Sequence, residues 1–309
     1  MNKVKVLDCT LRDGGLTNEF RFPERYIKDH IRMLSQAKVD YLELGYKADP
    51  QIYDKAAYGQ LKFCDDDLIR ELIKDITTLP KLAFMVDVGR FDPKRILDAS
   101  ESPFQMCRVA CYLEELAQAI EDVRFFQAKG YEITLNIMAI SKEQISDVVQ
   151  GLRKIREEIP FVAVYVVDSF GALYPDEIKN LVALYKEGLY GMPVGIHVHN
   201  NMQLAFSNTI TAIDSGAEFL DASVNGMGRG AGNCPLECLL PYVDKNKYDL
   251  KPILSLIKDH FTNDDERGWG YCPKQLLTGI FNQHPVKSIQ GAGEDLIQIY
   301  DNFQSGVEA

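Results

Sequence analysis

Short apolar segments alternate with longer amphipathic segments along most of this 309-residue chain. Several of the short segments are almost wholly apolar, as residues 162–167 (VAVYVV) illustrate. Such runs are typical of parallel strands that are buried on both faces, and the longer segments have the spacing of amphipathic helices. Eight strands alternating with helices within about 240 residues predict an α/β fold, the (β/α)8 TIM barrel.

The expected strands are Val4–Thr10, Val39–Tyr46, Lys81–Val88, Phe104–Ala110, Glu132–Ile140, Phe161–Asp168, Val194–His199 and Glu218–Val224. The expected helices include Glu24–Ala37, Tyr112–Lys129, Lys142–Glu158, Pro175–Glu187 and Gln203–Ser215. A doubly wound open sheet is the alternative, because alternation alone does not show that a sheet closes. The first strand lacks the glycine-rich dinucleotide fingerprint after it, which favours the barrel. We expect the catalytic barrel at residues 1–250 and a short C-terminal helical extension, residues 251–309, packed on it.

The composition narrows the class of protein. The chain carries 34 Lys and Arg against 45 Asp and Glu, a net charge of −11 that repels phosphate backbones and argues against nucleic acid as a partner. No apolar run approaches the roughly 20 residues that span a bilayer, so we expect no membrane partner. The seven cysteines form no CxxC pair, which favours a reducing compartment over a disulfide framework. A cytoplasmic protein is therefore expected.

Two of the five histidines lie together in the sequence IHVHNN, at the end of the seventh expected strand. Because side chains alternate between the two faces of a strand, His197 and His199 point the same way. The active sites of TIM barrels lie at this end of the strands. Two imidazoles on one face supply two ligands for a metal ion, and the alternative is a pair of hydrogen-bonded histidines without a metal.

Two further clusters follow the first and the last expected strands. Arg12 and Asp13 lie just past the first strand, and glycines alternate through the loop 225–233 past the eighth. Taken alone, the first cluster could be a surface ion pair and the second a flexible loop or a phosphate cradle. In a closed barrel, strand eight lies between strands seven and one, so Asp13, Asn233 and the two histidines converge on one stretch of the rim. Two nitrogens and two oxygens suit Mn²⁺, Mg²⁺ or Zn²⁺.

These motifs resemble those of a known family. The segments Thr10–Gly14 (TLRDG), His197–Asn201 (HVHNN) and Gly228–Asn233 (GRGAGN) are similar to the signatures of the HMG-CoA lyase-like metallolyases. That family of divalent-metal barrels includes 4-hydroxy-2-oxovalerate aldolase, HMG-CoA lyase, isopropylmalate synthase and homocitrate synthase. The resemblance covers the whole expected barrel, with motifs at its start, at strand seven and after strand eight.

The resemblance implies roles for individual residues. The implied metal ligands are Asp13, His197 and His199, with Asn233 as a fourth or nearby ligand. Arg12 is implied to stabilise an enolate. Asp168 and Ser169 lie in the segment DSFGA, which is similar to a stretch of the oxovalerate aldolases that holds the carboxylate of the 2-oxo acid. Glu43, an acid in a largely apolar strand, is a further catalytic candidate, although buried acids are often merely paired with an arginine.

The sequence also departs from the family pattern. The oxovalerate aldolases have a histidine soon after the RDG motif, whereas this chain has Leu16 in the corresponding stretch, GLTN. The general base is therefore left open between a metal-bound water, Tyr46, Tyr271 and His284. HMG-CoA lyase has a cysteine before the final asparagine of its last loop, whereas here a cysteine follows Asn233, which argues against that subtype.

We expect a class II, divalent-metal-dependent aldolase that cleaves or forms a carbon–carbon bond next to a 2-oxo acid such as pyruvate. Mn²⁺ or Mg²⁺ is the favoured metal and Zn²⁺ the alternative. The expected partners are a small 2-oxo acid and an aldehyde, and the resemblance implies a homodimer or a complex with an aldehyde dehydrogenase. Three other functions stay open: a Schiff-base aldolase through Lys47, an acyl-CoA-dependent Claisen condensing synthase, and a non-catalytic metal-binding barrel.

Overall fold

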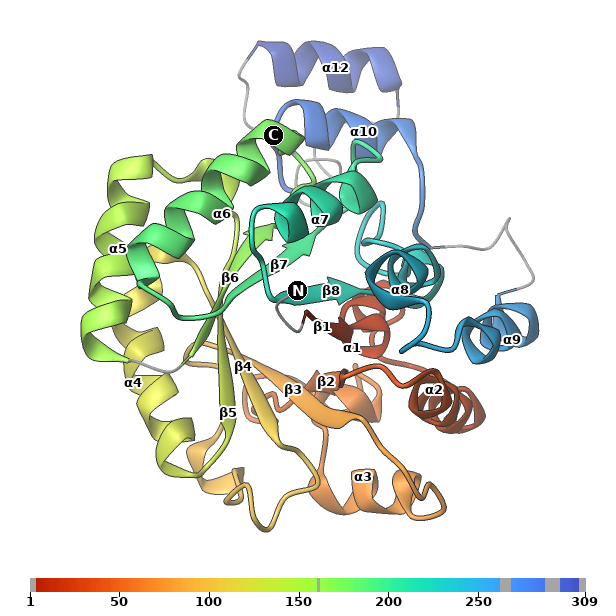
Figure 1. Ribbon diagram of the computed structural model, residues 1–309. Coiled ribbons are helices and arrows are strands. Elements are labelled where there is room, and N and C mark those ends of the chain that lie inside the picture. The colour runs from red at the N-terminus through yellow and green to blue at the C-terminus, as the bar shows by residue number, and fades with distance from the viewer. Residues whose placement is uncertain (1–3, 160–161, 262–267, 287–294, 306–309) are drawn as a thin grey trace.

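The computed structural model describes residues 4–159, 162–261, 268–286 and 295–305, which include a closed barrel of eight parallel strands (Figure 1). The strands are β1 Lys5–Asp8, β2 Tyr41–Tyr46, β3 Lys81–Asp87, β4 Met106–Cys111, β5 Glu132–Ile137, β6 Ala163–Asp168, β7 Val194–Val198 and β8 Phe219–Ala222. The barrel closes where β1 pairs with β8, with Leu7 opposite Asp221. The predicted fold and all eight expected strands are confirmed, although most strands are shorter than expected at their ends.

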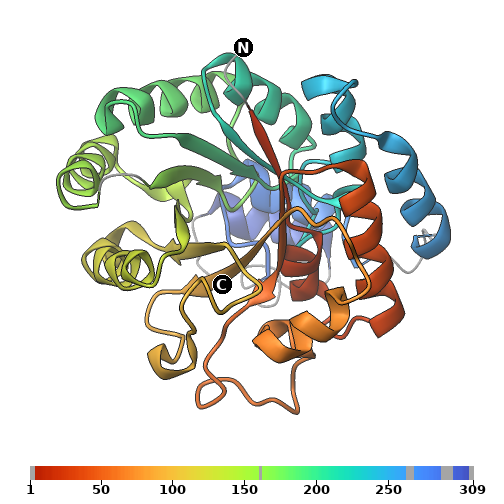
Figure 2. The ribbon, with the colours of Figure 1, turned by 60° about the horizontal axis from the view of Figure 1, so that its bottom comes forward.

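Helices surround the strands, as Figure 2 shows. They are α1 Thr10–Gly14, α2 Glu24–Ala37, α3 Asp66–Ile73, α4 Leu116–Ala128, α5 Ile145–Glu158, α6 Pro175–Leu189, α7 Ala205–Asp214, α8 Leu236–Asp244, α9 Leu250–His260, α10 Pro273–Ile280 and α12 Leu296–Gln304. The strict alternation fails once, because β3 and β4 are joined by a 3-10 turn, Pro93–Arg95, with no α-helix. Gly89 and the pair Asp92–Pro93 explain this difference, since glycine, aspartate and proline favour turns.

The residues past the barrel pack in two places. Helix α9 lies against α2 and α8 in the outer ring, and the N–H of Asp249 donates to the carbonyl of Ala37 (Figure 1). Helices α10 and α12 pack on each other instead, through Leu277, Phe281, Ile299 and Phe303. The Nδ2 group of Asn201, just after β7, donates to Oγ1 of Thr278 in α10 at 2.9 Å. The extension therefore reaches the C-terminal ends of the strands, while the boundary expected near residue 250 stays a prediction.

The side chains inside the barrel form layers. Leu7, Tyr41, Met106, Ala163 and Phe219 belong to an apolar cluster that is separate from the main core between strands and helices. Two residues further along their strands, Glu43, Arg108, Tyr165 and Asp221 form a mostly charged layer. This alternation by two follows from the geometry of strands, and it places the charged layer directly below the C-terminal rim.

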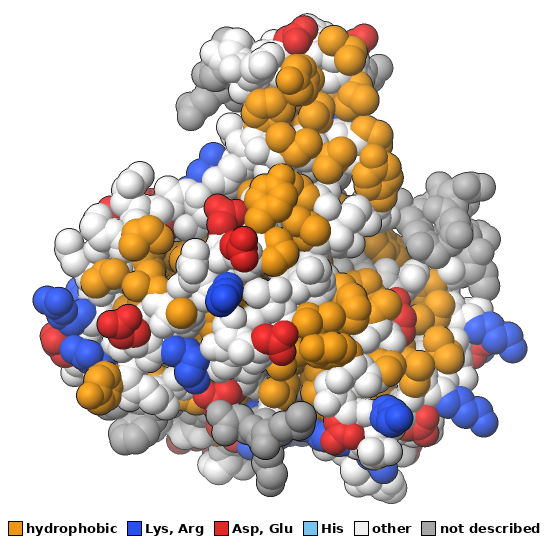
Figure 3. All heavy atoms as spheres, turned by 45° about the horizontal axis from the view of Figure 1, so that its top comes forward, with side chains coloured by type: hydrophobic (Ala, Val, Ile, Leu, Met, Phe, Trp, Pro, Cys, Tyr) orange, Lys and Arg blue, Asp and Glu red, His pale blue; other side chains and the backbone are white. Residues whose placement is uncertain are grey.

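The C-terminal helices also carry exposed apolar side chains. Ile280, Leu296, Ile297 and Tyr300 are all more than a third exposed, and Figure 3 shows a dense hydrophobic surface on this part of the molecule. Among the described helices, none has both the length and the apolar character that crossing a membrane requires.

Candidate metal centre

The C-terminal ends of β1, β7 and β8 bring the expected metal ligands together. Asp13 lies in α1, a short helical turn that starts directly after β1, and its N–H donates to the carbonyl of Cys9 at 2.8 Å. Asp13, His197 and His199 each offer one ligand atom, and these atoms all lie within 4.8 Å of one another. All three residues are buried. Their spacing is suitable for one shared metal ion.

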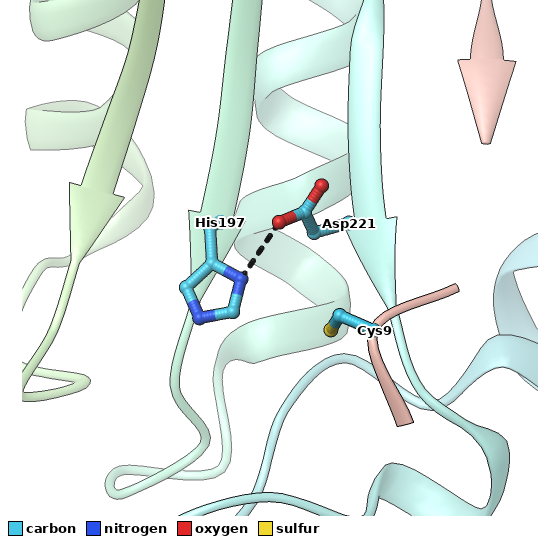
Figure 4. Close-up of side chains that lie close together, drawn as sticks. All are labelled: Cys9, His197 and Asp221. Carbon is cyan, nitrogen blue, oxygen red and sulfur yellow. Dashed lines mark hydrogen bonds and ion pairs between the residues drawn. The ribbon is translucent and has the colours of Figure 1, made fainter. Parts of the chain in front are cut away.

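His197 is oriented by the neighbouring strand. Its Nδ1 lies 3.0 Å from Oδ2 of Asp221 in β8 (Figure 4). A carboxylate accepts hydrogen bonds, so Nδ1 is the nitrogen that donates to Asp221, and Nε2 is the nitrogen left for a metal ion. Metal-binding histidines characteristically have such a carboxylate on the second nitrogen, because it fixes the tautomer and the ring orientation. Asp221 was not among the predicted site residues. Like Glu43, however, it is an acid in a largely apolar strand, and that pattern could have identified it.

His199 and Asn233 complete the group. The Nε2 atom of His199 lies 4.0 Å from Oδ2 of Asp13, and burial lowers the pKa of His199 to about 3. The imidazole is therefore neutral at neutral pH, as a metal ligand must be. Asn233 pairs with His199 through an isolated backbone bridge, and its Nδ2 donates to Oδ2 of Asp13 at 2.8 Å. Its Oδ1 is buried and has no hydrogen-bond partner among the described residues.

Asp13 keeps its negative charge in this environment. Burial by itself would raise the pKa of the carboxyl, but the Arg12 guanidinium, 2.6 Å from Oδ1, lowers it well below its usual range. The backbone N–H of Arg229 donates to Oδ2 at 3.2 Å. One ionised carboxylate therefore faces two imidazoles, a donor set that suits a divalent cation.

Cys9, His197 and Asp221 form a second group with metal-ligand spacing (Figure 4). Here the carboxylate oxygen that faces His197 is also bound by Arg108, at 2.7 Å. The Cys9 thiol donates to the carbonyl of Ala222, and burial raises the pKa of the thiol well above its usual value. Since only the thiolate binds metals well, the group around Asp13 is the better site.

Glu43 lies beneath the site and not in its wall. Its Oε2 accepts hydrogen bonds from Nε of Arg12 at 2.8 Å and from Nη1 of Arg108 at 2.9 Å. Nη2 of Arg108 binds Asp221 in turn, and Arg108 is completely buried. Glu43 thus links the guanidinium beside Asp13 to the carboxylate that holds His197. This geometry supports a positioning role for Glu43, whose catalytic assignment stays a prediction.

Asp168 and Ser169 follow β6 and differ in their surroundings. The Asp168 carboxylate accepts hydrogen bonds from the N–H groups of Ala172 and Leu173, and burial raises its pKa to about 6. Asp168 therefore holds the β6 loop together. Ser169 lines the pocket beside the histidines, where its Oγ accepts the N–H of Ala139. Of the two expected substrate-binding residues, the structure places only Ser169 in the wall of that pocket.

A pocket of about 440 Å³, including its open mouth, lies over the metal ligands. Side chains from the ends of all eight strands line it, including Arg12, Tyr46, Asn136, Ser169 and Arg229. Sequence reasoning left Asn136 and Arg229 unassigned, although Arg229 belongs to the glycine-rich loop. Tyr46 is the one residue considered as a base that lines this pocket. Burial and the Asp87 carboxylate raise the pKa of its phenol.

The other expected proton carriers and the Schiff-base lysine lie elsewhere. Tyr271 lines a neighbouring groove and is mostly exposed. The ring of His284 lies 6.0 Å from that of Phe170. Lys47 does not reach the pocket, because its buried ammonium is paired with Asp66 between the barrel and α3.

Gly228 gives a first test of the site. A Cβ added there would lie 2.2 Å from Nδ2 of Asn233 and 2.5 Å from Oδ2 of Asp13. We expect Gly228→Ala to displace both groups and to weaken metal binding by about 10- to 100-fold, the effect of disturbing atoms that orient metal ligands. Calorimetric titration with Mn²⁺ measures this. Gly268→Ala, whose added Cβ would meet only Thr17 at an ordinary contact distance of 3.6 Å, is the control. Equal affinity of the Gly228 variant and the unmodified protein would contradict the assignment.

Known proteins show the same architecture. The HMGL-like family model matches residues 3–258. The chain is 27% identical to oxaloacetate decarboxylase of Mycobacterium tuberculosis, over 92% of this chain and 83% of that protein. It is 29% identical to 4-hydroxy-2-oxovalerate aldolase of Bacillus cereus, over 80% of this chain and 71% of that protein. The crystal structure of the N-terminal domain of a proposed aldolase from Bacteroides vulgatus superimposes with a TM-score of 0.81 at 28% identity, covering 96% of this chain and 99% of that one.

Proposed function

This chain belongs to the HMGL-like family, as its motifs predicted, and on that premise we propose that it is a divalent-metal-dependent carbon–carbon lyase acting on a 2-oxo acid. The reaction that we propose first cleaves a 4-hydroxy-2-oxo acid to pyruvate and an aldehyde, or runs in reverse. The observation that carries the proposal is the convergence of Asp13, His197 and His199 in a pocket that also holds Arg12 and Arg229.

The described residues fit a divalent cation. Asp13, His197 and His199 would hold it, and the buried Oδ1 of Asn233, which has no partner among the described residues, is the natural fourth donor. When bound, such an ion supplies Lewis-acid stabilisation for negative charge that develops on the 2-oxo group. A set of nitrogen and oxygen donors is compatible with Mn²⁺, Mg²⁺ and Zn²⁺. The carboxylate and amide oxygens favour Mn²⁺ or Mg²⁺.

Arg12 supplies fixed positive charge to the same place. Its guanidinium lines the pocket, and the carboxylates of Asp13 and Glu43 hold it from two sides. Arginine stays protonated, so it stabilises an enolate without donating a proton to it. In the cleavage direction, the C4 hydroxyl gives its proton to water and its oxygen becomes the aldehyde carbonyl, while the C3–C4 bond breaks and its electron pair forms the enolate of pyruvate. Arg12 would stabilise the negative charge on the enolate oxygen. Ser169 also lines the pocket, and in this proposal its hydroxyl binds the substrate carboxylate.

Tyr46 is the proton donor that the pocket offers. Because its pKa is raised, the phenol keeps its proton at neutral pH and suits the protonation of the enolate carbon, not the removal of a hydroxyl proton. The other titratable pocket residues are the metal ligands and two arginines. Among the described residues, therefore, the pocket supplies an acid more readily than a base.

A pocket with a proton donor but no matching side-chain base among its described residues favours a second reaction, the decarboxylation of a 2-oxo acid with a carboxylate on C3. Loss of CO2 leaves the same enolate and needs no base, because no hydroxyl proton has to be removed. It needs only charge stabilisation, from Arg12 and the cation, and a proton donor such as Tyr46. The relative from Mycobacterium tuberculosis is named for a reaction of this type.

Turnover tests separate these functions. We expect Mn²⁺-loaded protein to release pyruvate from 4-hydroxy-2-oxopentanoate or from oxaloacetate, and EDTA to abolish the release. Borohydride should not inactivate it, because Lys47 is held by Asp66 away from the pocket. Aldehyde as the second product supports the aldolase, and CO2 supports the decarboxylase.

Three other outcomes would contradict the proposal. Inactivation by borohydride with resistance to EDTA would favour a Schiff-base enzyme. Thiol release from acetyl-CoA in the presence of a 2-oxo acid would favour a condensing synthase. Tight metal binding without turnover of any of these compounds would favour a non-catalytic barrel.

A further inference from the structure

A second hollow adjoins the pocket over the metal ligands. It is lined by Leu16, Arg229, Trp269, Tyr271, Gln275 and Val286, and we call it the outer groove. Its volume is about 810 Å³ with the mouth included, against about 440 Å³ for the pocket. Leu16 and Arg229 line both hollows, so the two hollows adjoin at these side chains.

The groove offers apolar surface to a ligand, because the polar groups of Trp269 and Gln275 are bound within the protein. Nε1 of Trp269 donates to the carbonyl of Asn225 at 3.0 Å. The Gln275 amide donates to the carbonyl of Pro285 and accepts from Asn201. Beside Arg229, the wall therefore presents the rings of Trp269 and Tyr271 and the aliphatic side chains of Leu16 and Val286.

Arg229 stands where the two hollows meet. Its Nη2 donates to the carbonyl of Ser169 at 2.9 Å, while its buried Nε has no partner in the described part of the chain. No described carboxylate lies within ion-pair distance of its guanidinium. A cation at this junction attracts an anion, which favours the carboxylate end of a ligand on the pocket side of the groove.

We propose that the outer groove binds the substituent on C4 of the 2-oxo acid, and that this substituent is an aromatic or long aliphatic group. The inference rests on the proposed function, because it places the 2-oxo acid end in the pocket over the metal ligands. A methyl group on C4 would leave most of the groove to water. A phenyl ring, by contrast, buries its faces against Trp269, Tyr271 and Leu16.

The test uses the fact that Trp269 is the one tryptophan of the whole chain, so tryptophan emission reports on the groove alone. The probes are 2-oxo-4-phenylbutanoate and 2-oxobutanoate, which lack the C4 hydroxyl and cannot undergo aldol cleavage. Both are titrated into Mg²⁺-loaded protein by calorimetry and by fluorescence. We expect the phenyl compound to bind at least about tenfold more tightly, the effect of burying one aromatic ring. We also expect the phenyl compound alone to change Trp269 emission strongly.

Variants show whether the tighter binding of the phenyl compound arises in the outer groove. Tyr271→Ala should reduce the affinity ratio of the two probes, whereas Tyr190→Ala, which removes a tyrosine that is 85% exposed just past the C-terminal end of α6, should preserve it. Equal affinities of the two probes, with Mg²⁺-dependent binding of both, would overturn the groove assignment and leave the proposed function standing. Failure of both 2-oxo acids to bind would overturn both.

Discussion

His199→Ala should remove bound metal from the purified protein and lower turnover by at least about 1,000-fold. His199 is one of three residues whose ligand atoms lie within 4.8 Å of one another, and its neutral imidazole cannot be replaced by a methyl group. A metal ion that acts as a Lewis acid supplies several kcal/mol, and each 1.4 kcal/mol of lost transition-state stabilisation lowers the rate about tenfold. Metal analysis of the purified variant measures the first effect, and pyruvate release measures the second.

The control is His260→Ala. His260 lies on α9 in the outer ring of helices, where its Nε2 contacts Asp29 at 3.2 Å, and it does not line the pocket over the metal ligands. Its variant should keep the metal content and the turnover of the unmodified protein. Asp221→Asn provides an intermediate case, because it weakens the hydrogen bond that orients His197 but leaves all ligands in place. We expect about 10- to 100-fold weaker metal binding from it. Unchanged metal content of the His199 variant would refute the metal centre.

The sequence was sufficient for the parts of the molecule that depend on local pattern. Apolar runs predicted all eight strands, and the alternation of side chains along one strand predicted that His197 and His199 share a face. Asp13 could be placed on the same rim as the two histidines only because closure of the barrel makes β8 the neighbour of β1. The helix α1 was missed, since Thr10–Gly14 contains the whole RDG motif and is too short for a helical period to be read.

Other features depend on contacts between distant segments. The role of Glu43 could not be read from its strand, because it follows from Arg12 and from Arg108, which lies 65 residues further on. Asp168 looked like a substrate ligand next to Ser169, yet the loop that follows turns back and places two backbone N–H groups on its carboxylate. The outer groove was missed because Gly268–Cys272 has no regular period and acquires its position only by packing across the barrel.

Arg108→Met is expected to destabilise the fold by about 3–5 kcal/mol, the largest effect on stability that we predict. Arg108 is fully buried, and its guanidinium lies 2.9 Å from Glu43, 2.7 Å from Asp221 and 4.6 Å from the ring centre of Tyr165. Its removal leaves two buried carboxylates without their shared cation, and breaking a buried ion pair from one side typically costs this much. Urea unfolding followed by circular dichroism measures the loss.

Arg124→Met is the matched control, because Arg124 also contacts two carboxylates, of Glu121 and Glu158, but its side chain is 43% exposed. Exposed pairs contribute about 0–1 kcal/mol each, so this variant should change stability little. A triple variant, Arg108→Met with Glu43→Gln and Asp221→Asn, removes all three charges together and should recover most of the stability. It should not recover turnover, since Arg12 and His197 both lose the carboxylates that orient them. Equal stability losses in the Arg108 and Arg124 variants, or full turnover in the triple variant, would show that the charged layer does not position the site above it.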